Sequence, residues 1–116
     1  MTLLLRILFY VQALMGLSRF GGLLRAGLLW ETHVTLGVVI ALLALAGFRP
    51  RENVPVPGLR AAARFAPLLP LLTGAAILSQ SVQGRGFTLL HMLLGILALG
   101  LVEMAAAGER KAGAGS

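Results

Sequence analysis

Four long runs of apolar residues, at 3–18, 30–48, 61–79 and 87–106, restrict what this chain of 116 residues can fold into. A helix needs about 17–25 residues to cross the hydrocarbon core of a bilayer, and the length of each run is close to this range. None shows the alternation of apolar and polar residues that is typical of a membrane β-strand. A helix also satisfies its own backbone hydrogen bonds in lipid. We therefore predict an all-α integral membrane protein, an up-down-up-down four-helix bundle.

The composition agrees with a lipid environment and excludes several functional classes. Apolar residues make up 58% of the chain and charged residues 12%, whereas soluble domains have about 45–50% and about 25%. The net charge of +6 comes mostly from basic residues beside the apolar runs. There they meet lipid headgroups, so we expect no nucleic-acid partner. The absence of cysteine excludes disulfides, thiolate metal sites and covalent heme attachment.

Glycine, proline and polar residues separate the four runs. Paired glycines follow the first run, a proline-rich link at 50–58 follows the second, and a glycine-containing turn precedes the fourth. Such residues are typical of turns and chain breaks. Pro67 and Pro70 lie early in the third run and are expected to bend its helix or delay its start. We assign residues 1–107 to one transmembrane domain and 108–116 to a flexible polar tail.

The distribution of basic residues predicts the orientation in a cell (inner) membrane. Three arginines fall on one side of the predicted spans: Arg19, Arg25 and Arg85. Seven basic residues fall on the other side: Arg6, Arg49, Arg51, Arg60, Arg64, Arg110 and Lys111. Because the cytoplasmic side carries the excess of Lys and Arg, both termini are predicted to be cytoplasmic.

The two histidines of the chain, His33 and His91, take equivalent places in a weak internal two-helix repeat. They are 58 residues apart and lie near the starts of the second and fourth predicted helices. Repeats of this kind are common in membrane proteins, with halves of the same orientation related by an axis along the membrane normal. The same spacing separates two pairs of glycines, Gly16 with Gly74 and Gly37 with Gly95.

The placement of the two imidazoles predicts a heme site near the outer face. In an up-down-up-down bundle the second and fourth helices are diagonal neighbours. With adjacent axes about 8–10 Å apart, the diagonal is roughly 12–14 Å, which suits a flat macrocycle between two side chains. Two imidazoles are a standard ligand set for the iron of a b-type heme. We predict that His33 and His91 bind one heme b; the alternative is that they are interfacial or hydrogen-bond the backbone.

Other residues of the predicted site have a second interpretation each. The glycines Gly16, Gly37, Gly74 and Gly95 leave space for the macrocycle, or they allow the close helix packing for which membrane bundles use small residues. The arginines of the histidine side, Arg19, Arg25 and Arg85, are candidate partners of the heme propionates or contact headgroups. No catalytic residue set is predicted, and two histidines are too few for a zinc site made by the protein alone.

Three segments resemble one four-helix half of heme A synthase and other small bis-histidine membrane cytochromes b. They are residues 10–16 (YVQALMG), 31–37 (ETHVTLG) and 91–95 (HMLLG). The resemblance implies a heme held by the histidines of helices two and four. The chain departs from that family's Glu-x-x-His-Arg motif, since Glu31 precedes His33 by two positions and Val34 follows it. It also has one bundle rather than two, so the resemblance implies heme binding more than heme-modifying catalysis.

Three functional hypotheses follow. The first is a b-type cytochrome for electron transfer or redox sensing, with a redox partner or a place in a larger respiratory complex. The second is a cofactor-free accessory or assembly subunit of a membrane complex. The third is a half-transporter that dimerises, which would need more polar residues at the midplane than this chain offers. The sequence leaves open whether the protein is a homodimer, and it does not name the electron donor or acceptor.

Overall fold

The computed structural model describes residues 2–20 and 28–113, with the side chains of all of these except 19, 20 and 28–30. The described residues form helices and no strand, which confirms the predicted all-α class. The helices are α1 (Thr2–Phe20), α2 (Leu28–Gly47), α3 (Pro57–Phe65), α4 (Leu68–Leu78) and α5 (Arg85–Lys111).

The third predicted helix is broken into α3 and α4 at Pro67. Proline has no backbone N–H and its ring clashes with the preceding turn, so the regular hydrogen-bond ladder stops where Pro67 precedes α4. The predicted effect of the prolines is thereby confirmed. The helix also starts earlier than residue 61, because Pro57 occupies the first turn of α3, where a missing N–H costs nothing.

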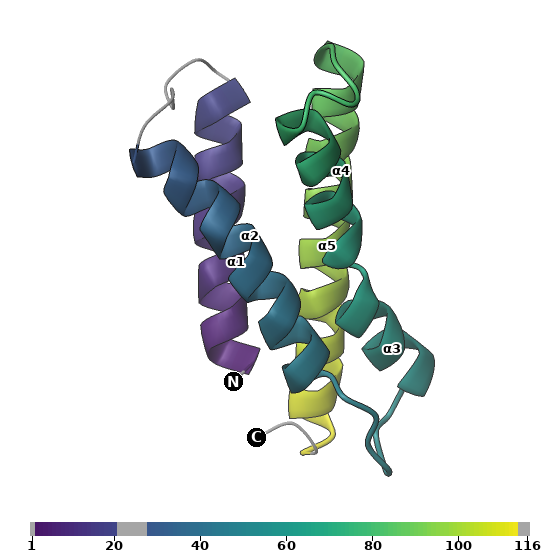
Figure 1. Ribbon diagram of the computed structural model, residues 1–116. Helices are drawn as coiled ribbons and strands as arrows, with labels where there is room; N and C mark the ends of the chain where they lie inside the picture. The colour runs from purple at the N-terminus through teal and green to yellow at the C-terminus, as the bar shows by residue number, and fades with distance from the viewer. Residues whose placement is uncertain (1, 21–27, 114–116) are drawn as a thin grey trace.

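The chain forms a bundle in which α1, α2, the broken helix α3–α4 and α5 run in alternating directions (Figure 1). Helix α1 packs against α2 and α5, and the broken helix α3–α4 packs against the same two. Helices α2 and α5, which carry the two histidines, are therefore diagonal to each other, as predicted. The start of α1 and the end of α5 lie at one end of the bundle, at the bottom of Figure 1.

The hydrophobic core occupies the half of the bundle nearer to that end. Its largest fully buried side chains are Leu5 of α1, Phe48 after α2, and Val102 of α5. Alanines of α3 and α5 fill the space between them. Helix α4, at the opposite end, contains no buried residue. The fully buried apolar side chains are therefore concentrated at the end opposite to the histidines.

The burial pattern repeats at the 58-residue spacing of the histidines. Pairs of buried residues at this spacing are Leu5 with Ala63, Ile40 with Ala98, Ala44 with Val102, and Phe48 with Ala106. The contacts between the halves repeat as well. Arg6 of α1 pairs with Glu103 of α5, and Arg64 of α3 donates from Nε to the carbonyl of Leu45 in α2, at 3.0 Å. Leu45 and Glu103 are again equivalent positions, so the repeat extends to the packing of the two helix pairs.

Helix α5 continues to Lys111, beyond the predicted end of the transmembrane domain at residue 107. Glu109 is buried and pairs with Arg60 of α3, so the residues on either side of it are held in the helix. The stretch 108–111, which we assigned to a flexible tail, is therefore part of the bundle.

Within residues 2–20 and 28–113, two helical segments are long and apolar enough to cross a membrane, judged by length and composition. They are Pro57–Leu78, which joins α3 and α4, and Arg85–Lys111. The apolar stretches Thr2–Ser18 and Glu31–Gly47 of the other two helices are shorter.

Candidate heme-binding site

The rings of His33 and His91 face each other across the diagonal of the bundle. Their centroids are 6.4 Å apart and their planes are inclined by 82°. His33 is buried, with 8% of its surface exposed, and His91 is half-buried. Each histidine lies in the second turn of a helix that starts at the end of the bundle away from the core. The predicted juxtaposition of the two imidazoles is thus present in the structure.

Each imidazole lies against a glycine of the preceding helix in the chain. A Cβ atom at Gly74 of α4 would lie 2.9 Å from Cε1 of His91, closer than side chains tolerate. A Cβ atom at Gly16 of α1 would lie 3.4 Å from Cε1 of His33. These two glycines therefore provide the space that the rings occupy. The repeat therefore extends to the geometry of these contacts, since Gly16 lies against His33 as Gly74 lies against His91.

Helix α4 also supplies a hydrogen-bonding partner for His91. Thr73 Oγ1 lies 3.1 Å from His91 Nδ1. The same hydroxyl lies 3.0 Å from the carbonyl of Leu69 and 3.1 Å from that of Pro70, so its one proton goes to the backbone of its own helix, as is common for threonine in helices. Thr73 Oγ1 can then accept from Nδ1–H, which leaves the lone pair on Nε2 of His91.

Gln12 ties α1 to the turn of α2 that carries His33. Its Nε2 donates to the backbone carbonyl of His33 at 2.7 Å. Its Oε1 is buried and has no hydrogen-bond partner among the atoms that the structure describes. Gln12 therefore links α1 to α2 at the histidine end.

Gly37 and Gly95 contact the neighbouring helix of their own hairpin. A Cβ atom at Gly37 would lie 3.3 Å from Nε2 of Gln12, and one at Gly95 would lie 3.9 Å from Cβ of Pro70. Gln12 and Pro70 are again 58 residues apart. Both glycines therefore lie where a neighbouring helix comes close, and their role beside a heme stays a prediction.

The three candidate propionate partners are not brought together in the described part of the structure. Arg85 is the first residue of α5 and is exposed at the histidine end. Arg19 lies in the last turn of α1, but its side chain is not among those described. Arg25 lies outside the described residues. The role predicted for these arginines stays a prediction.

The structure adds two features that the sequence did not indicate. The first is the contact of Thr73 with His91. Arg60 was counted as a surface charge, but it is buried and paired with Glu109. The described residues contain no group of three or more His, Cys, Asp or Glu that could hold a metal ion.

No family model, curated protein or solved structure matches the chain.

Proposed function

We propose that this protein is a four-span membrane cytochrome b in which His33 and His91 hold one heme as its two axial ligands. The heme supplies a reversible one-electron couple, so the function would be electron transfer or redox sensing. The observation that carries the proposal is the separation of the two rings, with centroids 6.4 Å apart.

This separation matches what one metal ion between two imidazoles requires. An imidazole nitrogen binds a transition metal at about 2.0–2.1 Å and the ring centre lies about 1.1 Å behind it, so two axial rings have centres about 6.3 Å apart. Two aromatic rings in direct contact span a wider range, about 4.5–7 Å. The observed distance lies within that range too, which is why the alternative below is kept.

The surroundings of the rings support ligation by the chain. Metal-binding histidines almost always direct their second nitrogen to a hydrogen-bond partner, which fixes the tautomer and the ring orientation. Thr73 Oγ1 provides such a partner for Nδ1 of His91. Gly16 and Gly74 fit the two rings against the neighbouring helices, and α4 exposes large apolar side chains at the histidine end, which suits contact with an apolar group.

A membrane location is supported by the apolar surface of the bundle. Soluble monomers rarely expose contiguous apolar patches larger than a few hundred Å². Here large apolar side chains are exposed along the whole length of the bundle, among them Leu4 of α1, Leu42 of α2, Leu72 of α4 and Leu93 of α5. The longest extent is 43 Å, close to the about 40–45 Å of a bilayer with its headgroups.

The orientation in the membrane follows from the charges at the two ends. The start of α1 and the end of α5 lie at the end opposite to the histidines (Figure 1), and most of the basic residues belong to the segments of that end. With the basic end cytoplasmic, the heme would lie near the outer face. Ligation by His33 and His91 together would leave the iron no open coordination site, which favours electron transfer over reactions that need one.

The alternative is a cofactor-free accessory subunit, in which the two rings pack directly against each other. The T-shaped arrangement, with 82° between the planes, is one of the preferred geometries of aromatic pairs. In that case the exposed apolar faces would contact a partner protein in the membrane.

The test is a reduced-minus-oxidised visible spectrum of detergent-purified protein, repeated for His33→Ala and His91→Ala. Thr35→Ala and Leu93→Ala are matched controls, because both side chains are exposed on the same two helices. We expect low-spin b-type bands at about one heme per chain, lost in either histidine variant and kept in both controls. Partial recovery with added imidazole would attribute the loss to ligation rather than to folding.

A colourless protein that stays colourless after addition of hemin would refute the heme proposal and favour the accessory subunit. Full heme content in both histidine variants would refute the assignment of the ligands.

A further inference from the structure

The two sides on which the helix pairs of the repeat meet differ beside the histidines. On one side α2 packs against α4, and on the equivalent side α1 packs against α5. On the α2–α4 side, Cδ1 of Leu71 would lie 3.8 Å from a Cβ atom at Gly37. This is an ordinary contact distance, so Leu71 lies against α2 one turn beyond His33.

The equivalent position on the α1–α5 side holds a much smaller side chain. Ala13 of α1 corresponds to Leu71 at the 58-residue spacing, and Gly95 of α5 corresponds to Gly37. A Cβ atom at Gly95 would lie 3.9 Å from Cβ of Pro70, and none of the described atoms of α1 would lie within 4 Å of it. The repeat is therefore broken at this level, because a leucine contacts the glycine on the α2–α4 side only.

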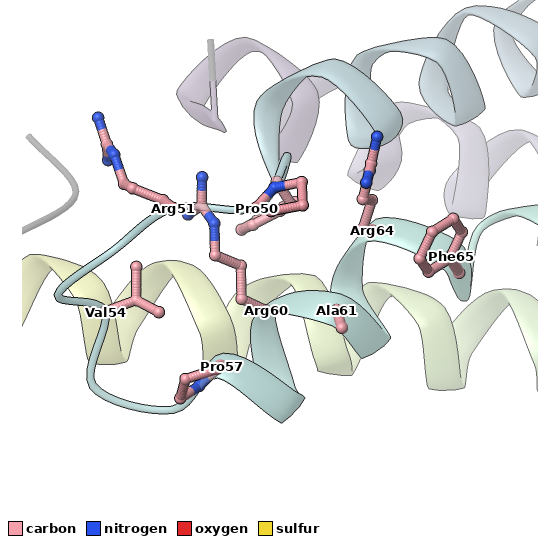
Figure 2. A pocket seen from close by; sticks show the side chains of 9 residues that line it. Pro50, Arg51, Val54, Pro57, Arg60, Ala61, Arg64 and Phe65 are labelled. Carbon is pink, nitrogen blue, oxygen red and sulfur yellow. The ribbon is translucent and has the colours of Figure 1, made fainter.

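Polar contacts join the helices on both sides at the end opposite to the histidines. Arg64 of α3 donates from Nε to the carbonyl of Leu45 in α2, at 3.0 Å, and Figure 2 shows this side chain extending from α3. Arg6 of α1 pairs with Glu103 of α5, and Ala13 lies two turns further along the same face of α1. The difference between the two sides is therefore a feature of the histidine end.

This difference bears on where a flat macrocycle can lie. A macrocycle held between two imidazoles extends past both rings in its own plane, so its edges must pass between helices at the level of the histidines. Packed sites accept added volume at a cost, because side chains and backbone have to shift. A leucine on one side and an alanine on the other therefore make the two sides unequal for such a group.

We propose that the heme site is one-sided, with Leu71 and Ala13 as the residues that set the position of the macrocycle. Leu71 excludes the macrocycle from the α2–α4 side, and the small side chain of Ala13 admits it on the α1–α5 side. This inference rests on the heme proposed above and adds to it the side of the bundle that the macrocycle occupies.

A symmetric site makes the opposite prediction for Leu71. With the macrocycle centred between the two sides, Leu71 would have to move away from α2, and its removal would strengthen heme binding. In a one-sided site, Leu71→Ala removes a contact with α2 without freeing space that the macrocycle uses. Hemin affinity should then stay within about threefold of the wild type.

The experiment is a titration of the heme-free, detergent-purified protein with hemin, followed by the Soret absorbance. Ala13→Leu fills the α1–α5 side, and its control Ala75→Leu makes the same change at an exposed position of α4. We expect Ala13→Leu to lose about tenfold or more in hemin affinity, and the control to lose less than about threefold. The control for Leu71→Ala is Leu72→Ala, at a side chain 64% exposed.

The double variant A13L/L71A separates positioning from general damage to the bundle. It moves the leucine to the equivalent place on the other side, so the space for the macrocycle changes sides. We expect hemin affinity to return to within about threefold of the wild type, with the low-spin spectrum of two axial imidazoles. Thermal unfolding of each heme-free variant shows whether a loss of hemin is a loss of space or of the fold.

Wild-type affinity in Ala13→Leu would overturn the inference. So would tighter binding by Leu71→Ala, which would place the macrocycle on the α2–α4 side. A double variant that binds no better than Ala13→Leu would overturn it too, because Leu71 would then not be the residue that closes that side. All three outcomes leave the heme in place. A wild type that binds no hemin would instead refute the proposed function, and this inference with it.

Discussion

Replacing Gly74 with alanine should move His91 out of position for an axial ligand. The added Cβ atom would lie 2.9 Å from Cε1, 3.4 Å from Nδ1 and 3.7 Å from Nε2 of that histidine. Since carbon atoms in contact prefer at least about 3.5 Å, the ring must retreat by about 0.6 Å. It cannot do so freely, because the ring is also hydrogen-bonded to Thr73 at 3.1 Å.

The expected magnitude follows from comparing this shift with the tolerance of a metal site. Metal–ligand distances hold to within about 0.2 Å, so a shift of about 0.6 Å is well outside the range. Disturbing the orientation of a ligand costs about 10–100-fold in metal affinity, and we expect a loss of this size for heme. The stability of the heme-free bundle should change little, because alanine is favoured over glycine in a helix by about 1 kcal/mol, which offsets much of the overpacking cost of about 1–3 kcal/mol.

The assay is a titration of heme-free protein with hemin, followed by the Soret absorbance, together with thermal unfolding of the heme-free form. Gly95→Ala is the control, since its Cβ atom would lie 3.9 Å from Cβ of Pro70, an ordinary contact, with no histidine atom within 4 Å. This variant should bind heme within about threefold of the wild type. Wild-type heme affinity in Gly74→Ala would show that His91 does not need its observed position, and the reasoning would be refuted.

Three further predictions follow from other contacts. Thr73→Val removes the hydrogen-bond partner of the imidazole Nδ1, which lowers the basicity of the ligand; the heme midpoint potential should become more positive in a redox titration, and an unchanged potential would contradict this. Glu109→Gln should lower the free energy of unfolding, measured in detergent solution, by about 3–5 kcal/mol, because it leaves the buried guanidinium of Arg60 without its charge partner. Glu103→Gln, at a site 27% exposed, should lower it by about 1 kcal/mol or less. Equal losses in the two variants would contradict the difference in burial. Because the chain has no cysteine, Ser81→Cys should react with an impermeant maleimide in intact cells and Glu52→Cys only after lysis, and the reverse pattern would contradict the proposed orientation.

The helices and the pairing of the histidines could be predicted from the sequence. Apolar runs bounded by glycine and proline place helix ends within a few residues, and Pro67 breaks its helix for a local reason. A shared distance from the start of two parallel helices also brings His33 and His91 to the same end. These are properties of single segments or of their spacing, so they can be read without knowing how the side chains pack.

Features that depend on helix rotation could not be predicted in the same way. Arg60 lies four residues from Arg64 on one face of α3, yet it is buried because that face meets Glu109 of α5. The partner lies 49 residues away in the chain, and no local pattern reveals it. The contact of Thr73 with His91 has the same origin. Pairwise contacts across the bundle depend on which face of each helix is turned inward, which propensity and hydropathy do not determine.

The 58-residue repeat suggests how small an ancestor of such a protein could be. Each half contributes one imidazole and one glycine that accommodates it, so a single two-helix unit carries half of the proposed site. Two copies of that unit, related by a twofold axis between the rings, would supply both ligands. Joining the copies with a short link such as 48–56 makes the association of the two halves intramolecular. Each half then meets the other at a higher effective concentration than two separate chains would. After such a fusion each half can diverge alone, and the replacement of Met15 by Thr73 at the equivalent position is a difference that a symmetric dimer cannot have.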